Sequence, residues 1–188
     1  MLCPVVVAVD PIHWFPTLSP KRMPELNEHI ASELLHQTGG LNVSAILEWL
    51  GNRFPGQVCF STSFSYEDQV ITHQLVQAGL PAKIFTLDTG RLFPETYSVW
   101  SSTLAMYPIT VHPYYPQQQL LQDFVGEKGP NSFYESVENR KQCCYIRKVE
   151  PLQRALTGMA VWITGLRAEH SAGRSDLPEF EWDPVNKV

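Results

Sequence analysis

The sequence has no apolar run long enough to span a membrane and no excess of positive charge. Its 188 residues carry 14 Lys and Arg against 19 Asp and Glu, a formal net charge of −5. This balance excludes a fold built as a whole to hold nucleic acid. The apolar stretch Leu2–Val9 lacks a basic region and meets Asp10 and Pro11 at once, unlike a signal peptide. We therefore predict a cytoplasmic protein without a membrane segment.

Cysteine is also scarce, and neither internal repeats nor low-complexity segments occur. Of the four cysteines, Cys3 and Cys59 lie in apolar surroundings and are expected to be buried as small hydrophobic residues. Cys143 and Cys144 are adjacent and are considered separately below. The hydrophobic content of 44% is that of a globular protein, and the length suits one compact domain.

What is present is an alternation of short apolar runs with helical patterns. Prolines crowd the first 24 residues and predict an irregular lead-in over residues 1–25, before a single α/β domain over residues 26–188. Helices are expected at Leu26–His36, Leu41–Phe54, Glu67–Ala78, Glu95–Met106, Gln117–Glu127 and Glu138–Leu156, the last with a kink at Pro151. Strands are expected at Gln57–Phe60, Lys83–Leu87, Ile109–His112 and Val161–Gly165. The alternation predicts a Rossmann-like parallel sheet with helices on both faces.

The loop after the first strand is a candidate binding site, because ligands of such sheets lie beyond the carboxyl ends of the strands. It offers the hydroxyls of Ser61, Ser63 and Ser65, and backbone N–H groups at a helix N-terminus suit an oxyanion. The same residues also fit a capping box, with Ser65 as N-cap and Asp68 three residues on. The two interpretations are compatible.

Two further loops follow strands. The loop after the second strand could contact ribose and phosphate through Leu87, Asp88, Thr89, Gly90 and Arg91, although an ordinary turn has the same composition. The loop after the fourth strand runs from Thr164 to Arg174. There Gly165, Arg167 and Arg174 could form an anion clamp, with a solvated loop as the alternative.

The adjacent cysteines favour ligation. A disulfide between neighbours requires a strained ring, and the cytoplasm disfavours disulfides. Lys141, Arg147 and Lys148 flank Cys143 and Cys144, and basic neighbours favour thiolates that can hold a metal or a cluster. Two core cysteines are the less attractive alternative, because their neighbours are charged.

Four segments together resemble the thiol-dependent sulfonucleotide (APS/PAPS) reductases. They are Cys-Cys-x-x-Arg-Lys-Val-x-Pro-Leu at 143–152, Leu-Asp-Thr-Gly-Arg at 87–91, Trp-Ile-Thr-Gly-Leu-Arg at 162–167 with Arg174, and Ser63-Phe64 with Glu67-Asp68. The resemblance implies the adenine nucleotide alpha hydrolase-like fold. The double cysteine is similar to that of the iron–sulfur branch, which uses adenylyl sulfate. Ser65 stands where many members have Gly, so a positive φ there would strain the loop.

By this resemblance the protein would reduce adenylyl sulfate to sulfite and AMP in assimilatory sulfate reduction, with thioredoxin or glutaredoxin as donor and a homo-oligomer as an allowed assembly. Cys143 and Cys144 would supply two of the four ligands of a 4Fe–4S cluster, and Lys148 would support the substrate. The family draws its other two ligands from a later Cys-x-x-Cys and its nucleophile from a Glu-Cys-Gly-Leu-His tail, and neither occurs in these 188 residues. We therefore expect a truncated chain without its catalytic tail, inactive by itself.

Three other functions stay open. A 3′-phosphoadenylyl-sulfate reductase would share most of the motifs. An ATP pyrophosphatase or adenylating ligase of the PP-loop class would share the fold, but its Gly-Gly loop is missing between Ser61 and Asp68. A non-catalytic scaffold could hold zinc through Cys143 and Cys144.

Overall fold

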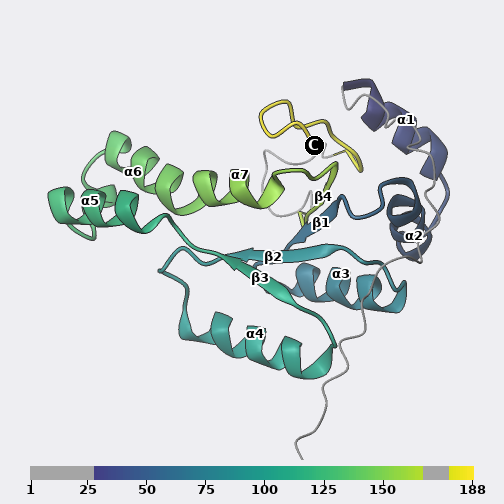
Figure 1. Cartoon of the computed structure of the whole chain (residues 1–188), viewed down its shortest axis with the longest axis horizontal. Coiled ribbons are helices and arrows are strands. Elements are labelled where there is room, and N and C mark those ends of the chain that lie inside the picture. Colours follow the sequence, from purple (N-terminus) through teal and green to yellow (C-terminus); the bar gives the residue numbers. More distant parts are fainter. Residues whose placement is uncertain (1–27, 167–177) are drawn as a thin grey trace, which may run out of the picture.

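The computed structural model describes residues 28–166 and 178–188. Two helices precede the sheet, and strands and helices then alternate (Figure 1). The helices are α1 (Glu28–Thr38), α2 (Val43–Arg53), α3 (Tyr66–Gln77), α4 (Pro94–Met106), α5 (Gln118–Lys128), α6 (Val137–Cys144) and α7 (Glu150–Leu156). The strands are β1 (Val58–Ser61), β2 (Lys83–Leu87), β3 (Val111–Tyr114) and β4 (Val161–Ile163). A 3₁₀ turn η1 (Ser132–Tyr134) and a π-helix η2 (Tyr145–Val149) complete the described elements.

The four strands form one parallel sheet in the order β3-β2-β1-β4. The chain first moves from β1 outward to β3, then returns to place β4 on the other side of β1. The strand order therefore reverses between β1 and β4, and such a switch point is where open α/β sheets bind ligands. The predicted parallel α/β fold is confirmed. The division into a lead-in and one domain stays a prediction, since residues 1–27 lie outside the described part.

Alternation along the strands packs both faces of the sheet. Phe60 and Ile84 face α3 and α4, which lie below the sheet in Figure 1. Cys59 and Phe85 face α7 on the opposite side, beside Ala155. Successive strand residues point to opposite faces, so a parallel sheet covered on both sides needs apolar residues at nearly every position.

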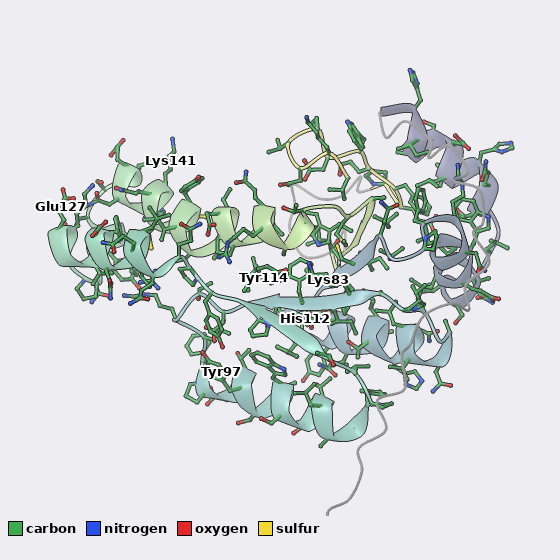
Figure 2. All side chains as sticks on the ribbon, in the orientation of Figure 1. Lys83, Tyr97, His112, Tyr114, Glu127 and Lys141 are labelled. Carbon is green, nitrogen blue, oxygen red and sulfur yellow. The ribbon has the colours of Figure 1, made fainter. Side chains whose placement is uncertain are left out.

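A lysine fastens α7 to the sheet. Figure 2 shows Lys83 and Tyr114 side by side above the sheet, and the Nζ atom of Lys83 lies 5.1 Å from the centre of the Tyr114 ring. The same Nζ donates to the carbonyl oxygen of Ala155 at 2.9 Å. The cation thus satisfies a carbonyl near the end of α7 while its stem covers apolar surface.

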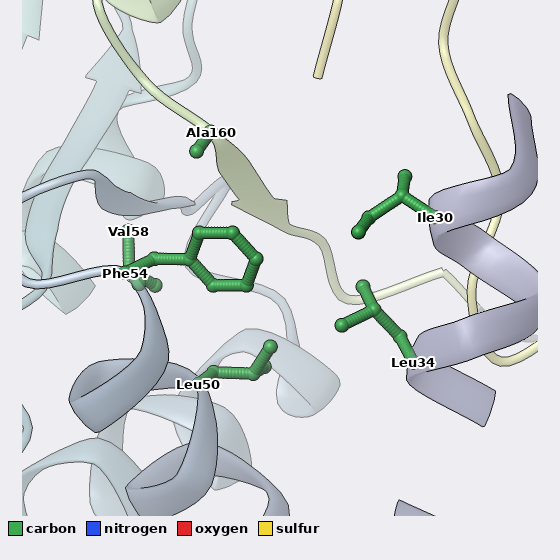
Figure 3. Packing of buried hydrophobic residues seen from close by; sticks show 6 residues of the cluster. All are labelled: Ile30, Leu34, Leu50, Phe54, Val58 and Ala160. Carbon is green, nitrogen blue, oxygen red and sulfur yellow. The ribbon is translucent and has the colours of Figure 1, made fainter. Parts of the chain in front are cut away.

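A third cluster joins the first two helices to the end of the sheet at β4. Within this cluster, Ile30 and Leu34 of α1 face Phe54, Val58 and Ala160 (Figure 3). Phe180 and Trp182 pack against the same cluster, and a cavity of about 270 Å³ lies among these elements. None of the described helices is both long and apolar enough to cross a membrane.

Two elements differ from expectation. The third strand was predicted over residues 109–112, but β3 covers Val111–Tyr114 and contains Pro113. Proline is tolerated there because β3 is the edge of the described sheet, where an N–H can be missing. The single long helix predicted over residues 138–156 is divided into α6, η2 and α7, and Pro151 is the second residue of α7, directly after the π-helix and Glu150.

Candidate functional site

A pocket of about 460 Å³ lies where the loops after β1, β2 and β4 converge. It brings together Ser61, Ser63, Ser65, Leu87 and Gly165, five of the residues singled out from the sequence. Thr62, Asp68, Thr86, Leu92, Thr96, Trp162, Thr164 and Leu166 complete its lining. Hydroxyl groups and apolar side chains make up most of the lining. The pocket can therefore hold an aromatic ring and offer hydrogen bonds at its edge.

The loop after β1 is organised by Asp68. Its Oδ2 accepts hydrogen bonds from the N–H and Oγ of Ser63, at 2.6 and 2.8 Å, and from the N–H of Ser65 at 3.4 Å. The Oγ of Ser65 in turn accepts from the N–H of Asp68, which completes the predicted capping box. The helix start was therefore readable from the sequence, whereas the burial of Asp68, only 4% exposed, was not.

The positive φ in this loop falls on Phe64. Ser65 has an ordinary extended backbone, with φ −66° and ψ 171°, whereas Phe64 has φ +64°. A bulky residue rarely adopts this conformation. Phe64 is buried and stacks on Trp100 of α4, with ring centres 5.4 Å apart. Packing of the aromatic side chain offsets the backbone strain, and serine in place of glycine at position 65 costs nothing.

The loop after β2 is held by Asp88. This buried carboxylate accepts from the N–H of Gly90 at 2.9 Å and from the hydroxyl of Tyr97 at 2.8 Å. The hydrogen bond to Asp88 raises the pKa of Tyr97, and partial burial adds to the effect. Gly90 has φ +69°, a conformation in which glycine alone is unstrained. Asp88 thus shapes a tight turn whose first residue, Leu87, lines the pocket.

Arg91 follows this turn but is used elsewhere. Its guanidinium donates to the carbonyl of Pro130 and to the side-chain oxygen of Asn131, and it stacks 4.7 Å from the centre of the Phe133 ring. These contacts tie the β2 loop to the segment between α5 and η1. The side chain is not part of the pocket lining.

Arg147 connects the π-helix to the β2 loop. Its Nη1 donates to the carbonyl oxygen of Thr89 at 2.6 Å, and a Cβ atom on Gly90 would lie 3.4 Å from the same nitrogen. The side chain is 8% exposed, and its Nε has no hydrogen-bond partner among the described residues. A π-turn re-aims side chains relative to an α-helix and is frequent at functional sites.

The two adjacent cysteines end α6 directly before this π-helix. Cys143 is buried against Phe124 and Ile146, while Cys144 is exposed, and so is Lys148. Across residues 28–166 and 178–188, no three His, Cys, Asp or Glu side chains gather closely enough to hold a metal ion. The chain therefore offers at this point two thiols and a buried guanidinium with one unsatisfied N–H.

The loop after β4 closes the pocket. Gly165 has no room for a side chain, since a Cβ atom there would come within 2.2 Å of Oδ1 of Asp68. The hydroxyl of Ser61 accepts from the indole N–H of Trp162 at 2.8 Å, joining β1 to β4 at the pocket wall. Arg167 and Arg174, the predicted anion clamp, lie outside the described residues.

Several pocket residues were missed in the sequence. Thr86 stands near the end of β2, a position that could have marked it, and Thr164 opens the loop already singled out after β4, with Trp162 two residues before it. Leu92 lies in the loop after β2 and Thr96 in the first turn of α4, and no local pattern marked their side chains within that segment.

The parallel order with its switch point between β1 and β4 defines an α/β protein of the adenine nucleotide alpha hydrolase-like fold. A solved structure of the phosphoadenylyl-sulfate (PAPS) reductase from Candida auris, in complex with phosphate, superposes with a TM-score of 0.63 and 26% sequence identity, covering 76% of this chain and 69% of that one. The family model for the phosphoadenosine phosphosulfate reductase domain matches residues 57–188. The chain belongs to this family, which confirms the resemblance drawn from the motifs.

Two curated relatives of this chain are named adenosine 5′-phosphosulfate reductase. The chain is 43% identical over 146 residues to the adenosine 5′-phosphosulfate reductase of Burkholderia cepacia, covering 78% of this chain and 58% of that protein. It is 44% identical over 129 residues to the adenosine 5′-phosphosulfate reductase of Allochromatium vinosum, covering 69% and 50%. The chain thus spans about half the length of the curated relatives it matches.

Proposed function

We propose that this chain forms the nucleotide-binding part of an enzyme that reduces adenylyl sulfate to sulfite and AMP with a thioredoxin-type donor. The observation that carries the proposal is the bond from Arg147 to Thr89. It ties the double-cysteine segment to the loop whose first residue, Leu87, lines the pocket at the switch point. The relatives named adenosine 5′-phosphosulfate reductase support this substrate.

The nucleotide is proposed to lie across Ser61–Ser65, Leu87–Gly90 and Gly165. A volume of about 460 Å³ is in the range of small-molecule sites. Leu87 and Trp162 can cover an adenine ring, and the hydroxyls of the β1 loop can reach the ribose. Arg91, committed to the segment before η1, supports this site by holding the β2 loop.

The phosphosulfate group of adenylyl sulfate is proposed to bind Arg167 and Arg174, with Lys148 nearby. These cations would neutralise charge that otherwise repels an attacking thiolate. In the reaction, the sulfur of a thiolate forms a bond to the sulfur of adenylyl sulfate, and the bond from that sulfur to the phosphate oxygen breaks. AMP leaves with its electron pair, and an S-sulfocysteine remains. Two thiols of the donor then release sulfite and are oxidised to a disulfide.

Cys143 and Cys144 are proposed as two of the four ligands of a 4Fe–4S cluster. The donor chemistry fits, because two thiols end α6 and the unpartnered Nε of Arg147 follows one turn later. When bound, such a cluster would add compact negative charge next to Cys143 and Cys144. Arg147 itself orients the β2 loop, and the exposed Lys148 remains available to the substrate.

Calorimetric titration tests the binding. The chain should prefer AMP and adenylyl sulfate to ATP with magnesium, and Arg174→Ala should weaken adenylyl sulfate about tenfold to a hundredfold. Arg53→Ala is the matched control, because Arg53 is the last residue of α2 and does not line the pocket. A preference for ATP with magnesium would instead favour an adenylating ligase. Absence of any nucleotide binding would favour a metal-binding scaffold.

A further inference from the structure

The carboxylate of Asp68 lies inside the loop after β1 and not at its surface. The side chain is 4% exposed, and its Oδ2 accepts from two backbone N–H groups and one hydroxyl, of Ser63 and Ser65. Backbone N–H groups of a loop that opens a helix ordinarily form a cradle for a phosphate or sulfate. Here a side chain of the same chain occupies the acceptor position.

Two further donors of the loop are also engaged. The N–H of Phe64 donates to Oγ1 of Thr62 at 3.0 Å, and the N–H of Asp68 donates to Oγ of Ser65. A phosphate at the loop would thus have to displace internal acceptors, and its oxygens would meet those of Asp68. The phosphate and the Asp68 carboxylate would repel one another, because both are negatively charged acceptors and neither offers the other a hydrogen-bond donor.

The loop after β4 keeps the carboxylate in place from the other side. Gly165 approaches Oδ1 of Asp68 so closely that a Cβ atom would lie 2.2 Å away. Both residues line the pocket at the switch point. Asp68 is therefore a fixed negative wall of that pocket and cannot swing aside without moving two loops.

We propose that Asp68 is a specificity-determining residue that excludes a second phosphate from the nucleotide pocket. The carboxylate fills the anion cradle, so a nucleotide with a single phosphate group fits and one that places another phosphate on this loop does not. The proposal rests on the proposed function, because it takes an adenine nucleotide as the occupant. The excluded phosphate could belong to the 3′ position of the ribose or to the polyphosphate of ATP.

The experiment compares three ligands, namely AMP, adenosine 3′,5′-bisphosphate and ATP, by calorimetric titration of the 188-residue chain. The parent should bind AMP at least about tenfold more tightly than either other ligand. Asp68→Asn keeps the size of the side chain and removes its charge, and Asp68→Ser also opens the cradle. Either variant should shift the affinity ratio toward the ligand with the extra phosphate by about tenfold or more.

Asp123→Asn is the matched control, because it makes the same chemical change at an exposed position on α5. It should leave the ratio unchanged. A gain for the bisphosphate alone assigns the cradle to the ribose side, and a gain for ATP alone assigns it to the 5′ chain. A parent that binds AMP, with ratios unchanged in both Asp68 variants, overturns the inference and leaves the proposed function standing. Loss of AMP binding in both variants also overturns it, by making Asp68 a structural requirement. A parent that binds no nucleotide removes the proposed function itself.

Discussion

Arg147 and Thr89 are 58 positions apart in the chain and are joined by a hydrogen bond of 2.6 Å from Nη1 to the carbonyl oxygen. The bond connects the π-helix after the double cysteine with the turn after β2. Because a buried guanidinium must find acceptors at a defined distance, this contact fixes the helix and the turn relative to one another.

Arg147→Lys tests that contact. Lysine keeps the charge, but a point ammonium cannot reproduce the planar fork that reaches Thr89. We expect the free energy of unfolding to fall by about 1–2 kcal/mol. AMP should bind several-fold more weakly, as measured by urea unfolding and calorimetry. Arg140→Lys, exposed on α6, is the control. Equal behaviour of the two variants would show that the bond positions nothing.

Gly90→Ala should destabilise the β2 turn. Gly90 has φ +69°, and a Cβ atom there would lie 3.4 Å from Nη1 of Arg147. We expect a loss of about 1 kcal/mol in the free energy of unfolding, measured with urea. Gly126→Ala is the matched control, since Gly126 lies within α5 with open space around it. There alanine should stabilise the chain by about 0.5–1 kcal/mol. The same sign for both substitutions would contradict the strain assigned to Gly90.

Cys59 should make stability depend on pH in the alkaline range. Burial raises the pKa of its thiol from 9.0 to about 12, although the nearby Lys83 lowers it somewhat. The folded chain thus keeps a proton that the unfolded chain releases, so the stabilisation is complete below pH 9 and is lost as the pH rises toward 12.

The measurement is urea unfolding between pH 8 and pH 10.5. The parent should lose roughly 1–2 kcal/mol more across this interval than Cys59→Ala does. Cys144→Ala removes an exposed thiol and should follow the parent. A Cys59→Ala variant with the parent's full pH dependence would place the responsible group elsewhere.

Iron content tests the double cysteine. Cys59 of β1 is fully buried against α7, so Cys143 and Cys144 are the thiols that the described part offers to a cluster. After anaerobic reconstitution with iron and sulfide, we expect well under the roughly four irons of a complete cluster per chain. Replacing Cys143 and Cys144 by Ala should abolish what is bound, whereas Cys59→Ala should not. A brown protein with about four irons would reveal additional ligands.

The elements and their order were predictable because apolar periodicity and turn residues agree along most of the chain. Pro113 was misleading, since a strand was expected to stop before it and the edge position of β3 tolerates it. The interruption of the last helix had one local signal, Pro151, but the π-helix before it and the direction of Arg147 toward Thr89 could not be read from the local sequence.

Part of the pocket was also predictable from the sequence. Strand ends marked Ser61, Leu87 and Gly165, because the carboxyl ends of parallel strands share one edge. The positive φ was sought at Ser65 and falls on Phe64, where stacking on Trp100 stabilises it. The direction of Arg91 depends on Phe133 and Asn131, which are far away in the sequence.

The strand order of the sheet also affects how fast the chain can fold. β1 obtains its second neighbour only when β4 arrives, and Cys59 and Val161, joined across that pair, are 102 positions apart. Closing so long a segment must precede the pairing that rewards it, so ordering of the centre of the sheet should be late. Until then one side of β1 is an open, apolar strand edge, which can pair with another nascent chain. Refolding at low protein concentration should therefore give the higher yield.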